Sequence, residues 1–326
     1  MKIAVLGSGG WGTALAVHLA RAGHDAVLWG RDPEKIRRIQ AERANPTHLE
    51  GVKLPDRLKV TADAPAKTDA YVVAVPTQHI RATLGRLKGK LDAAKPFVSV
   101  SKGIEIDTLK LPTELIGEAV GARSRAALSG PSHAIEVARG LPASLVAASE
   151  DPAVAELIRG IFMGPTMRVY TSPDRVGVEV AGALKNVIAV AAGICDGLQL
   201  GDNAKAALIV RGAVEISRFS AALGARSETI HGLAGAGDLI VTCTSRHGRN
   251  LRAGREIGSG KALADVLLGM TQVAEGVWTA KAVMPWSKKL GVDLPICREV
   301  YRILYESRPA AEAVRELMGR TPKNEF

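Results

Sequence analysis

Short apolar runs alternate with amphipathic segments along the first half of the chain. We expect strands at the apolar runs, which are residues 3–6, 26–29, 71–75, 97–100, 126–128, 145–147 and 169–170. The segments between them show helical periodicity, which predicts helices over residues 13–22, 33–43, 80–87, 112–120 and 152–162. Asp32 and Asp151 each precede a proline, which is a typical helix start. This α/β alternation indicates a doubly wound, mostly parallel sheet.

The pattern changes near Pro173, where strand-like runs give way to long segments rich in Ala, Leu, Val and Ile. We expect helices over residues 176–192, 203–223, 262–268, 277–289 and 295–305, so the second half should be all-α. The expected division is a sheet-containing domain of residues 1–175 and a helical domain of residues 176–326. No Ser/Gly-rich or Pro-rich linker separates them, so we expect the two domains to pack together around a cleft.

Composition narrows the class of protein. Apolar residues make up 47% of the 326 residues, yet no run approaches the roughly 18–20 uninterrupted apolar residues of a membrane span, so we expect no integral membrane segment. Cys195, Cys243 and Cys297 are far apart and lack metal-ligand spacing, which argues against disulfides and zinc and favours a reducing, cytoplasmic location. The net charge of +10 favours anionic partners, and the 4% aromatic content favours small phosphorylated molecules over nucleic acid.

A glycine-rich segment, Gly7-Ser8-Gly9-Gly10-Trp11-Gly12, lies between the first expected strand and the first expected helix. Gly7 suits a tight turn, Gly9 lets the backbone approach a pyrophosphate, and Gly12 lets helix and strand pack closely. The helix N-terminus adds unpaired N–H groups for the anion. The segment therefore predicts a dinucleotide site.

The end of the second expected strand bears on the type of cofactor. An acidic residue there binds the adenosine ribose of NAD, whereas an arginine accepts the 2′-phosphate of NADP. Arg31 comes first, and Asp32 can instead cap the helix that starts at Pro33. NADPH is therefore favoured and NADH stays open, while a methyltransferase, which usually has an acidic residue at this place, is disfavoured.

The expected helix over residues 176–192 is apolar except for Glu179, Lys185 and Asn186. No carboxylate lies three or four residues from Lys185, so a buried Lys185 would have no partner on its own helix. Burial would lower its pKa from about 10.4 toward neutrality, where a lysine can exchange protons. The pattern leaves open whether Lys185 instead reaches the surface or pairs with an acid from elsewhere.

Several polar segments are candidates for ligand binding. Ser101-Lys102-Gly103 and Ser129-Gly130-Pro131-Ser132-His133 follow expected strands, at the sheet edge where ligands of such folds bind, although either could be a plain loop. Asp238 follows a glycine-rich turn and is most simply a helix N-cap. A basic run could bind phosphate, form a solvated face or contact nucleic acid; it consists of Arg246, His247, Arg249, Asn250, Arg252 and Arg255.

Together these segments resemble the bacterial type of NAD(P)-dependent glycerol-3-phosphate dehydrogenase over nearly the whole chain. The matching motifs are Gly7 to Ala16, Ser101 to Gly103, Ser129 to Ser132, Gly182 to Asn186, Asn203 to Gly212, Gly235 to Leu239, Thr242 to Ser245, Arg249-Asn250 and Glu275-Gly276. The resemblance implies a Rossmann-like domain followed by an all-α domain of the 6-phosphogluconate dehydrogenase type, usually as a homodimer. It implies reduction of dihydroxyacetone phosphate to sn-glycerol 3-phosphate with NADPH or NADH, for glycerophospholipid synthesis.

The resemblance also implies roles for individual residues, without a metal. The catalytic residues are Lys185, Lys102 and Asp238. The cofactor would contact Gly7, Gly9, Gly10, Trp11, Gly12, Arg31, Lys102, Ala134, Arg249, Val273 and Glu275. The substrate would contact Lys102, Gly130, Ser132, Lys185, Asp238, Gly248, Arg249 and Asn250. Gly248 replaces the serine that the family commonly has, which removes a hydroxyl donor to the phosphate, and Trp11 replaces a Tyr or Phe.

Two other functions share these features. A related dehydrogenase of another hydroxy acid, of the 6-phosphogluconate or ketopantoate type, would have the same architecture. A non-enzymatic nucleotide-binding or nucleic-acid-binding protein could use the glycine-rich segment and the basic run, but it would have no reason to bury Lys185.

Overall fold

The computed structural model describes residues 1–245, 248–270, 273–322 and 324. Its first half is built on an eight-stranded sheet in the order β10-β9-β8-β7-β6-β1-β2-β5. The strands are β1 (Lys2–Leu6), β2 (Asp25–Trp29), β5 (Lys59–Thr61), β6 (Ala70–Val73), β7 (Phe97–Ser99), β8 (Arg125–Ser129), β9 (Ala143–Ala148) and β10 (Met167–Ser172). Neighbouring strands are parallel except β8 and β9, so the expected mostly parallel sheet is confirmed.

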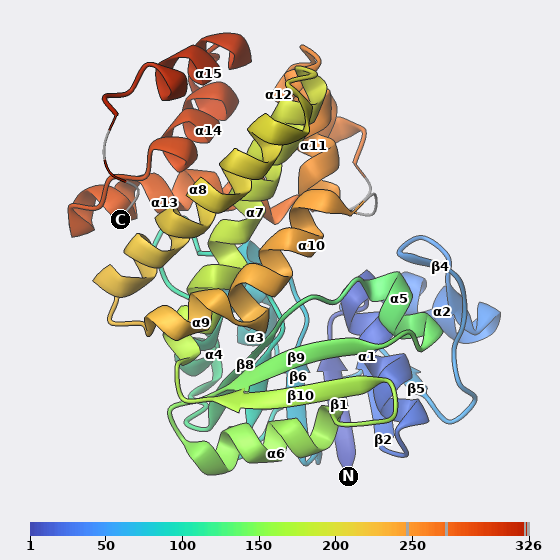
Figure 1. Cartoon of the computed structure of the whole chain (residues 1–326). Helices are drawn as coiled ribbons and strands as arrows, with labels where there is room; N and C mark the ends of the chain where they lie inside the picture. The colour runs from blue at the N-terminus through green and yellow to red at the C-terminus, as the bar shows by residue number, and fades with distance from the viewer. Residues whose placement is uncertain (246–247, 271–272, 323, 325–326) are drawn as a thin grey trace.

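Helices cover both faces of this sheet (Figure 1). They are α1 (Gly10–Arg21), α2 (Pro33–Glu42), α3 (Ile80–Gly85), α4 (Pro112–Val120), α5 (Ala134–Arg139) and α6 (Pro152–Phe162). Ile3 and Val5 of β1 pack into a core shared with α1, α2 and α6, whereas Ala4 and Leu6 pack into a core shared with α3 and α4. This alternation is the doubly wound arrangement, because successive side chains of a strand point to opposite faces.

Asp32 and Asp151 begin their helices as the sequence predicts. The side chain of Asp32 accepts hydrogen bonds from the backbone N–H groups of Glu34 (3.0 Å) and Lys35 (3.2 Å). The side chain of Asp151 accepts one from Ala153 at 2.9 Å. Each aspartate thus satisfies N–H groups that have no partner within the helix.

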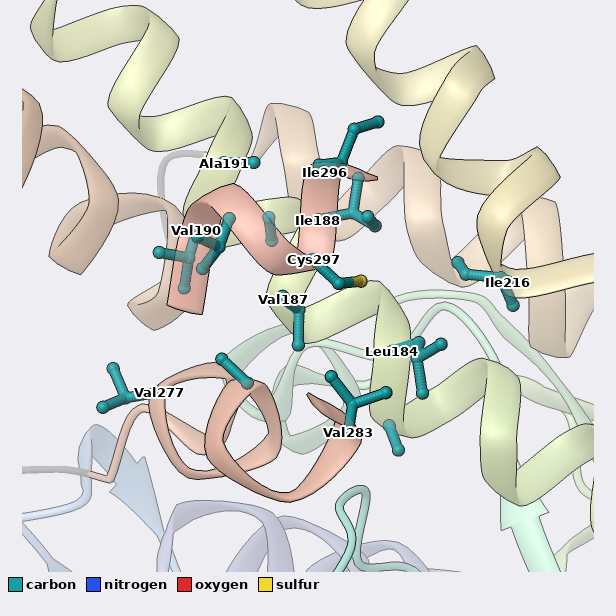
Figure 2. Packing of buried hydrophobic residues seen from close by; sticks show 14 of the residues in the cluster. Leu184, Val187, Ile188, Val190, Ala191, Ile216, Val277, Val283, Ile296 and Cys297 are labelled. Atoms are coloured by element: carbon teal, nitrogen blue, oxygen red, sulfur yellow. The ribbon is translucent and has the colours of Figure 1, made fainter. Parts of the chain in front are cut away.

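The second half is helical and sits at one end of the sheet (Figure 1). Its helices are α7 (Arg175–Gly197), α8 (Gly201–Ala222), α9 (Ser227–His231), α10 (Asp238–Thr244), α11 (Arg249–Gly258), α12 (Leu263–Leu268), α13 (Glu275–Leu290), α14 (Pro295–Tyr305) and α15 (Ala310–Met318), with a π-helical turn at Leu233–Gly237. Figure 2 shows α7 in the middle of the packing, with Leu184 and Val187 near Val283 of α13 and Cys297 of α14. Helix α7 is long and apolar enough to cross a membrane, but its apolar window is wholly buried inside the protein, as in a core helix.

Some elements are not among those expected. A two-stranded antiparallel pair, β3 (Ala44–Asn45) and β4 (Leu49–Lys53), lies apart from the main sheet. Leu49 and Val52 of β4 pack in a small cluster with Ala14 of α1 and Ala138 of α5. This places the β3–β4 pair beside the glycine-rich segment.

Candidate active site

The glycine-rich segment lies where the strand order reverses. From β1 the chain runs to β2 on one side, and from β6 it runs to β7 on the other, so the carboxyl ends of β1 and β6 form the switch point where ligands of such sheets bind. A Cβ atom on Gly7 or Gly12 would collide with backbone, and Gly7 has a φ of 126°. A Cβ on Gly9 would meet nothing within 4 Å, so the backbone of Gly9 is open to an approaching ligand.

A buried cluster of charged side chains lies where the helical half meets the sheet. Lys185 Nζ of α7 donates to Asp238 Oδ1 at 2.7 Å and to Thr242 Oγ1 at 2.6 Å. Lys102 Nζ, which follows β7, donates to Asp238 Oδ2 at 2.7 Å and to the carbonyl of Gly130 at 3.1 Å. Asp238 is 1% exposed and Lys185 is 5% exposed, whereas the side chain of Lys102 keeps 17% of its surface. One carboxylate therefore holds two ammonium groups, of which Lys102 is the more open.

The electrostatics of this cluster set the protonation of Lys185. Burial lowers the pKa of Lys185 to about 8; Asp238 opposes this shift and Lys102 adds to it. Burial alone would raise the pKa of Asp238, but the charges and hydrogen bonds of Lys102 and Lys185 hold that pKa below its usual value. Asp238 is thus a stable anion, and Lys185 is a cation that loses its proton within reach of neutral pH.

The structure shows the partner of Lys185, which the sequence pattern left open, and it corrects the expected role of Asp238. Lys185 pairs with an acid from another helix, 53 residues along the chain. The expectation of an N-cap at Asp238 is wrong, because the N-cap residue of α10 is Gly237 and Asp238 is the first residue of the helix. Its side chain is occupied by two lysines, which no short-range pattern reveals.

A carboxylate from α13 reaches the sheet-containing half. Glu275 Oε1 accepts from the backbone N–H of Thr77 at 2.9 Å, across 198 residues of sequence. Its Oε2 is buried and has no hydrogen-bond partner among the described residues. Gly103 lies directly beside this oxygen, since a Cβ atom on Gly103 would be 2.9 Å from it. Burial raises the pKa of Glu275 to about 7, against the hydrogen bond from Thr77 and the charge of Arg249. A buried acceptor without a partner is the kind of group that a bound ligand satisfies.

Comparison with known proteins places the chain in a family. Models of the NAD-dependent glycerol-3-phosphate dehydrogenase N-terminus and C-terminus match residues 2–155 and 174–315. A glycerol-3-phosphate dehydrogenase [NAD(P)+] of Chlorobium phaeobacteroides is 46% identical, over 100% of this chain and 99% of the relative. The chain belongs to the NAD-dependent glycerol-3-phosphate dehydrogenase family. It is therefore an oxidoreductase that uses NAD or NADP.

Solved structures agree with the family, and they include a more distant match to the ketopantoate type of dehydrogenase. The crystal structure of glycerol-3-phosphate dehydrogenase from Coxiella burnetii matches with a TM-score of 0.93 and 36% identity, over 98% of this chain and 99% of that one. A ketopantoate reductase structure from Ralstonia eutropha matches with a TM-score of 0.64 and 16% identity, over 96% of this chain and 100% of that one. The second likeness extends to the fold alone.

An asparagine network ties helix α7 of the dehydrogenase to its neighbours. Asn186 Nδ2 of α7 donates to the carbonyl of Lys102 at 3.2 Å. Asn250 Nδ2 of α11 donates to Asn186 Oδ1 at 2.8 Å, and Asn250 Oδ1 accepts from the N–H of Gly276 at 3.0 Å. The amide of Asn250 is thus engaged within the protein and fixes α11 against α7 and α13.

The remaining candidate residues do not form a single cluster. Ser132 Oγ donates to the carbonyl of Gly130 at 2.9 Å, which keeps both close to Lys102. Trp11 and Ala134 lie together in the cluster beside β4, and the buried indole N–H of Trp11 has no partner among the described residues. Gly10 begins α1, Arg31 is exposed after β2, and Val273 lies two residues before α13.

The basic run is only partly described, since Arg246 and His247 lie outside the described residues. Gly248 is the N-cap residue of α11, and its N–H donates to the carbonyl of Ser245 at 3.1 Å. Arg249, the first residue of α11, is solvent-exposed, yet surrounding protein lowers its pKa and Glu275 opposes that shift. These properties fit a guanidinium at the open side of the site.

Sequence reasoning missed two residues at the site. Thr242 accepts from Lys185 and donates to the carbonyl of Asp238 at 2.6 Å. Its signal was the spacing from Asp238, because residues four apart share a helix face. Lys35, four residues after Arg31, donates through Nζ to the carbonyl of Ser8 at 3.0 Å, within the glycine-rich segment.

Proposed function

We propose that Lys185 is the proton donor when this dehydrogenase reduces dihydroxyacetone phosphate to sn-glycerol 3-phosphate. The observation that carries the assignment is the buried cluster in which Asp238 holds Lys185 and Lys102 at 2.7 Å each. A ketone that becomes an alkoxide needs a proton and a positive charge at its oxygen. Two ammonium groups around one carboxylate supply both.

Each member of the cluster has its own task. Bound NADPH or NADH supplies the hydride for the ketone carbon. Lys185 gives its proton to the ketone oxygen and takes it back when the alcohol is oxidised. Asp238 and Thr242 fix the position of Lys185 Nζ, because both accept hydrogen bonds from it. Lys102 stabilises negative charge on the substrate oxygen from the more open side of the cluster.

The residues present fit a dinucleotide. The open backbone at Gly9 and the N-terminus of α1 suit the pyrophosphate. Glu275 Oε2, buried and without a partner among the described residues, is an acceptor for an N–H donor of the nicotinamide. Arg31, at the end of β2, is the residue that we expect to bind a 2′-phosphate, which supports a preference for NADPH over NADH. Trp11, Ala134, Val273 and the side chains of Lys102 and Arg249 complete the proposed cofactor contacts.

The substrate phosphate would bind at the start of α11. The first turn of a helix presents N–H groups without intrahelical partners, and Arg249 adds a guanidinium. Gly248 offers no hydroxyl there, and its own N–H is used by Ser245, so Arg249 carries more of the phosphate binding than in relatives with serine. Gly130 and Ser132 would line the opposite side, next to Lys102.

We also expect a division into domains near residue 175, a homodimer, and a cytoplasmic enzyme that serves glycerophospholipid synthesis. The last strand of the sheet ends at Ser172 and the helical half begins with α7 at Arg175, which supports the division. Sedimentation equilibrium tests the dimer, which would have twice the 34.3 kDa mass of the chain.

The reaction is tested by following the absorbance of NADPH and of NADH in parallel, with dihydroxyacetone phosphate and with a ketone-free control. We expect oxidation that depends on the ketone and is faster with NADPH at low cofactor concentration. Oxidation with ketopantoate but not with dihydroxyacetone phosphate would mean that the substrate is a different ketone. Equal rates with both cofactors would reject Arg31 as the 2′-phosphate reader.

A further inference from the structure

The hydrogen bond from Lys35 to Ser8 is not needed to satisfy the carbonyl of Ser8. Its Nζ donates to the carbonyl of Ser8, but Asn45 Nδ2 donates to the same oxygen at 3.0 Å and also to Thr13 Oγ1 at 2.8 Å. Asn45 is 1% exposed, so its bond to Ser8 is protected from water. The carbonyl of Ser8 therefore stays satisfied if the ammonium of Lys35 moves away.

The neighbourhood of Lys35 is the corner where β2 ends. Gly30 has no side chain there, and a Cβ on it would lie 2.6 Å from Ser8 Oγ and 2.7 Å from Ile36 Cδ1. Ser8, Gly30 and the first turn of α2 thus meet at one point. In doubly wound dinucleotide sites this corner receives the 2′ position of the adenosine ribose.

The corner has a surplus of positive charge. Arg31 lies just before the N-cap residue of α2, and Lys35 lies in the first turn of that helix. Partial burial lowers the pKa of Lys35, and the nearby charge of Arg31 adds to this shift. The charge of Asp32 opposes that shift, but the Asp32 side chain is occupied by the N–H groups of Glu34 and Lys35. Arg31 and Lys35 are therefore two cations beside a carboxylate that already accepts two hydrogen bonds. They suit a ligand that carries about two negative charges, which is the charge of a phosphate monoester near pH 7.

We propose that Lys35 is a second specificity residue for the 2′-phosphate of NADP, acting together with Arg31. In the free protein Lys35 Nζ rests on the carbonyl of Ser8; with NADPH bound it donates to the phosphate, while Asn45 keeps Ser8 in place. The proposal rests on the dinucleotide site of the proposed function, but not on the identity of the ketone.

The test is the ratio of the dissociation constants for NADH and NADPH, measured on the full chain by quenching of tryptophan fluorescence without any ketone. Lys35→Met removes the ammonium and keeps most of the aliphatic stem. We expect the preference for NADPH to fall about tenfold, which corresponds to about 1.4 kcal/mol. Lys35→Arg should keep the preference. Lys59→Met is the matched control, since Lys59 is an exposed lysine of β5 that pairs with Asp25.

Three outcomes would overturn the proposal. An unchanged ratio in Lys35→Met would mean that Lys35 does not reach the phosphate. Equal losses for both cofactors would mean that it only supports the loop at Ser8. The same loss in Lys59→Met would make the effect one of net charge. The titration contains no ketone, so its result for Lys35 holds even if the protein does not reduce dihydroxyacetone phosphate.

Discussion

Asp238 determines the charge balance of the site. It is one buried carboxylate between two ammonium groups, so the cluster keeps a net positive charge. Loss of one partner from a buried ion pair is costly because it leaves an uncompensated charge. The protonation of Lys185 therefore depends on Asp238 and Lys102 together.

The pH dependence of the reaction follows from Lys185. Its pKa is lowered to about 8, and ketone reduction needs its protonated form. We expect kcat/KM for dihydroxyacetone phosphate to be constant below this pH and to fall as pH rises through about 8. Oxidation of glycerol 3-phosphate needs the neutral amine, so its kcat/KM should rise over the same range. Rate profiles in the two directions that run in parallel would contradict the assignment.

Asp238→Asn provides the matched variant for that profile. The charge of Asp238 raises the pKa of Lys185, so its removal lets burial and Lys102 lower that pKa further. We expect the falling limb for reduction to move to lower pH by about one unit or more. A thermal unfolding curve checks that the variant is folded. An unmoved limb in a folded variant would show that Asp238 does not control the proton on Lys185.

Close packing fixes the position of helix α7 against helix α11. A Cβ on Gly254 of α11 would collide with the carbonyl of Val190 of α7, and one on Gly193 would collide with the carbonyl of Leu251. Because the helices touch along glycines, Lys185 on α7 and the start of α11 at Arg249 keep a fixed relation.

Gly254→Ala tests this contact. Alanine would favour an isolated helix by about 1 kcal/mol, but here we expect overpacking to lower the free energy of unfolding by about 1–3 kcal/mol. Gly160→Ala is the control, since Gly160 is exposed in α6 and a Cβ there meets nothing within 4 Å. That variant should be unchanged or slightly more stable. Urea unfolding of both compares them, and equal stabilities would contradict the packing account.

Periodicity predicted elements where it was strong and missed them where it was weak. The helices Pro112–Val120 and Pro152–Phe162 have the expected bounds, because proline marks their starts and apolar spacing runs through them. The sequence marks α11 mainly as a basic run, although Leu251, Gly254 and Ile257 give this helix a buried face. The β3–β4 pair is held by Leu49 and Val52 against other elements. These two buried residues are three apart, so β4 lacks the period of two that marks a strand.

The site draws on five elements that are far apart in the sequence. Lys102 follows β7, while Lys185, Asp238, Arg249 and Glu275 come from α7, α10, α11 and α13. The resemblance to the family supplied these residues, since residue patterns alone favoured an N-cap for Asp238 and left Lys185 undecided. Pairing across 53 to 198 residues depends on tertiary packing, which no local pattern encodes.

Glu275 links the helical half to the sheet, so its removal should affect both binding and ligand-induced stability. We expect Glu275→Ala to weaken NADPH binding about tenfold, because a buried acceptor is lost. At a concentration of 100 times the wild-type dissociation constant, NADPH should stabilise the wild type by about 2.7 kcal/mol and the variant by about 1.4 kcal/mol. Equal shifts in thermal unfolding would remove Glu275 from the cofactor site.

The most direct measurement compares turnover and cofactor binding in Lys185→Met, which keeps the side-chain volume and leaves Asp238 paired with Lys102. If Lys185 is the proton donor, kcat for dihydroxyacetone phosphate should fall by about 10² to 10⁴, while the dissociation constant for NADPH stays within about threefold. Turnover within tenfold of the wild type, or loss of NADPH binding in a folded variant, would contradict the central claim.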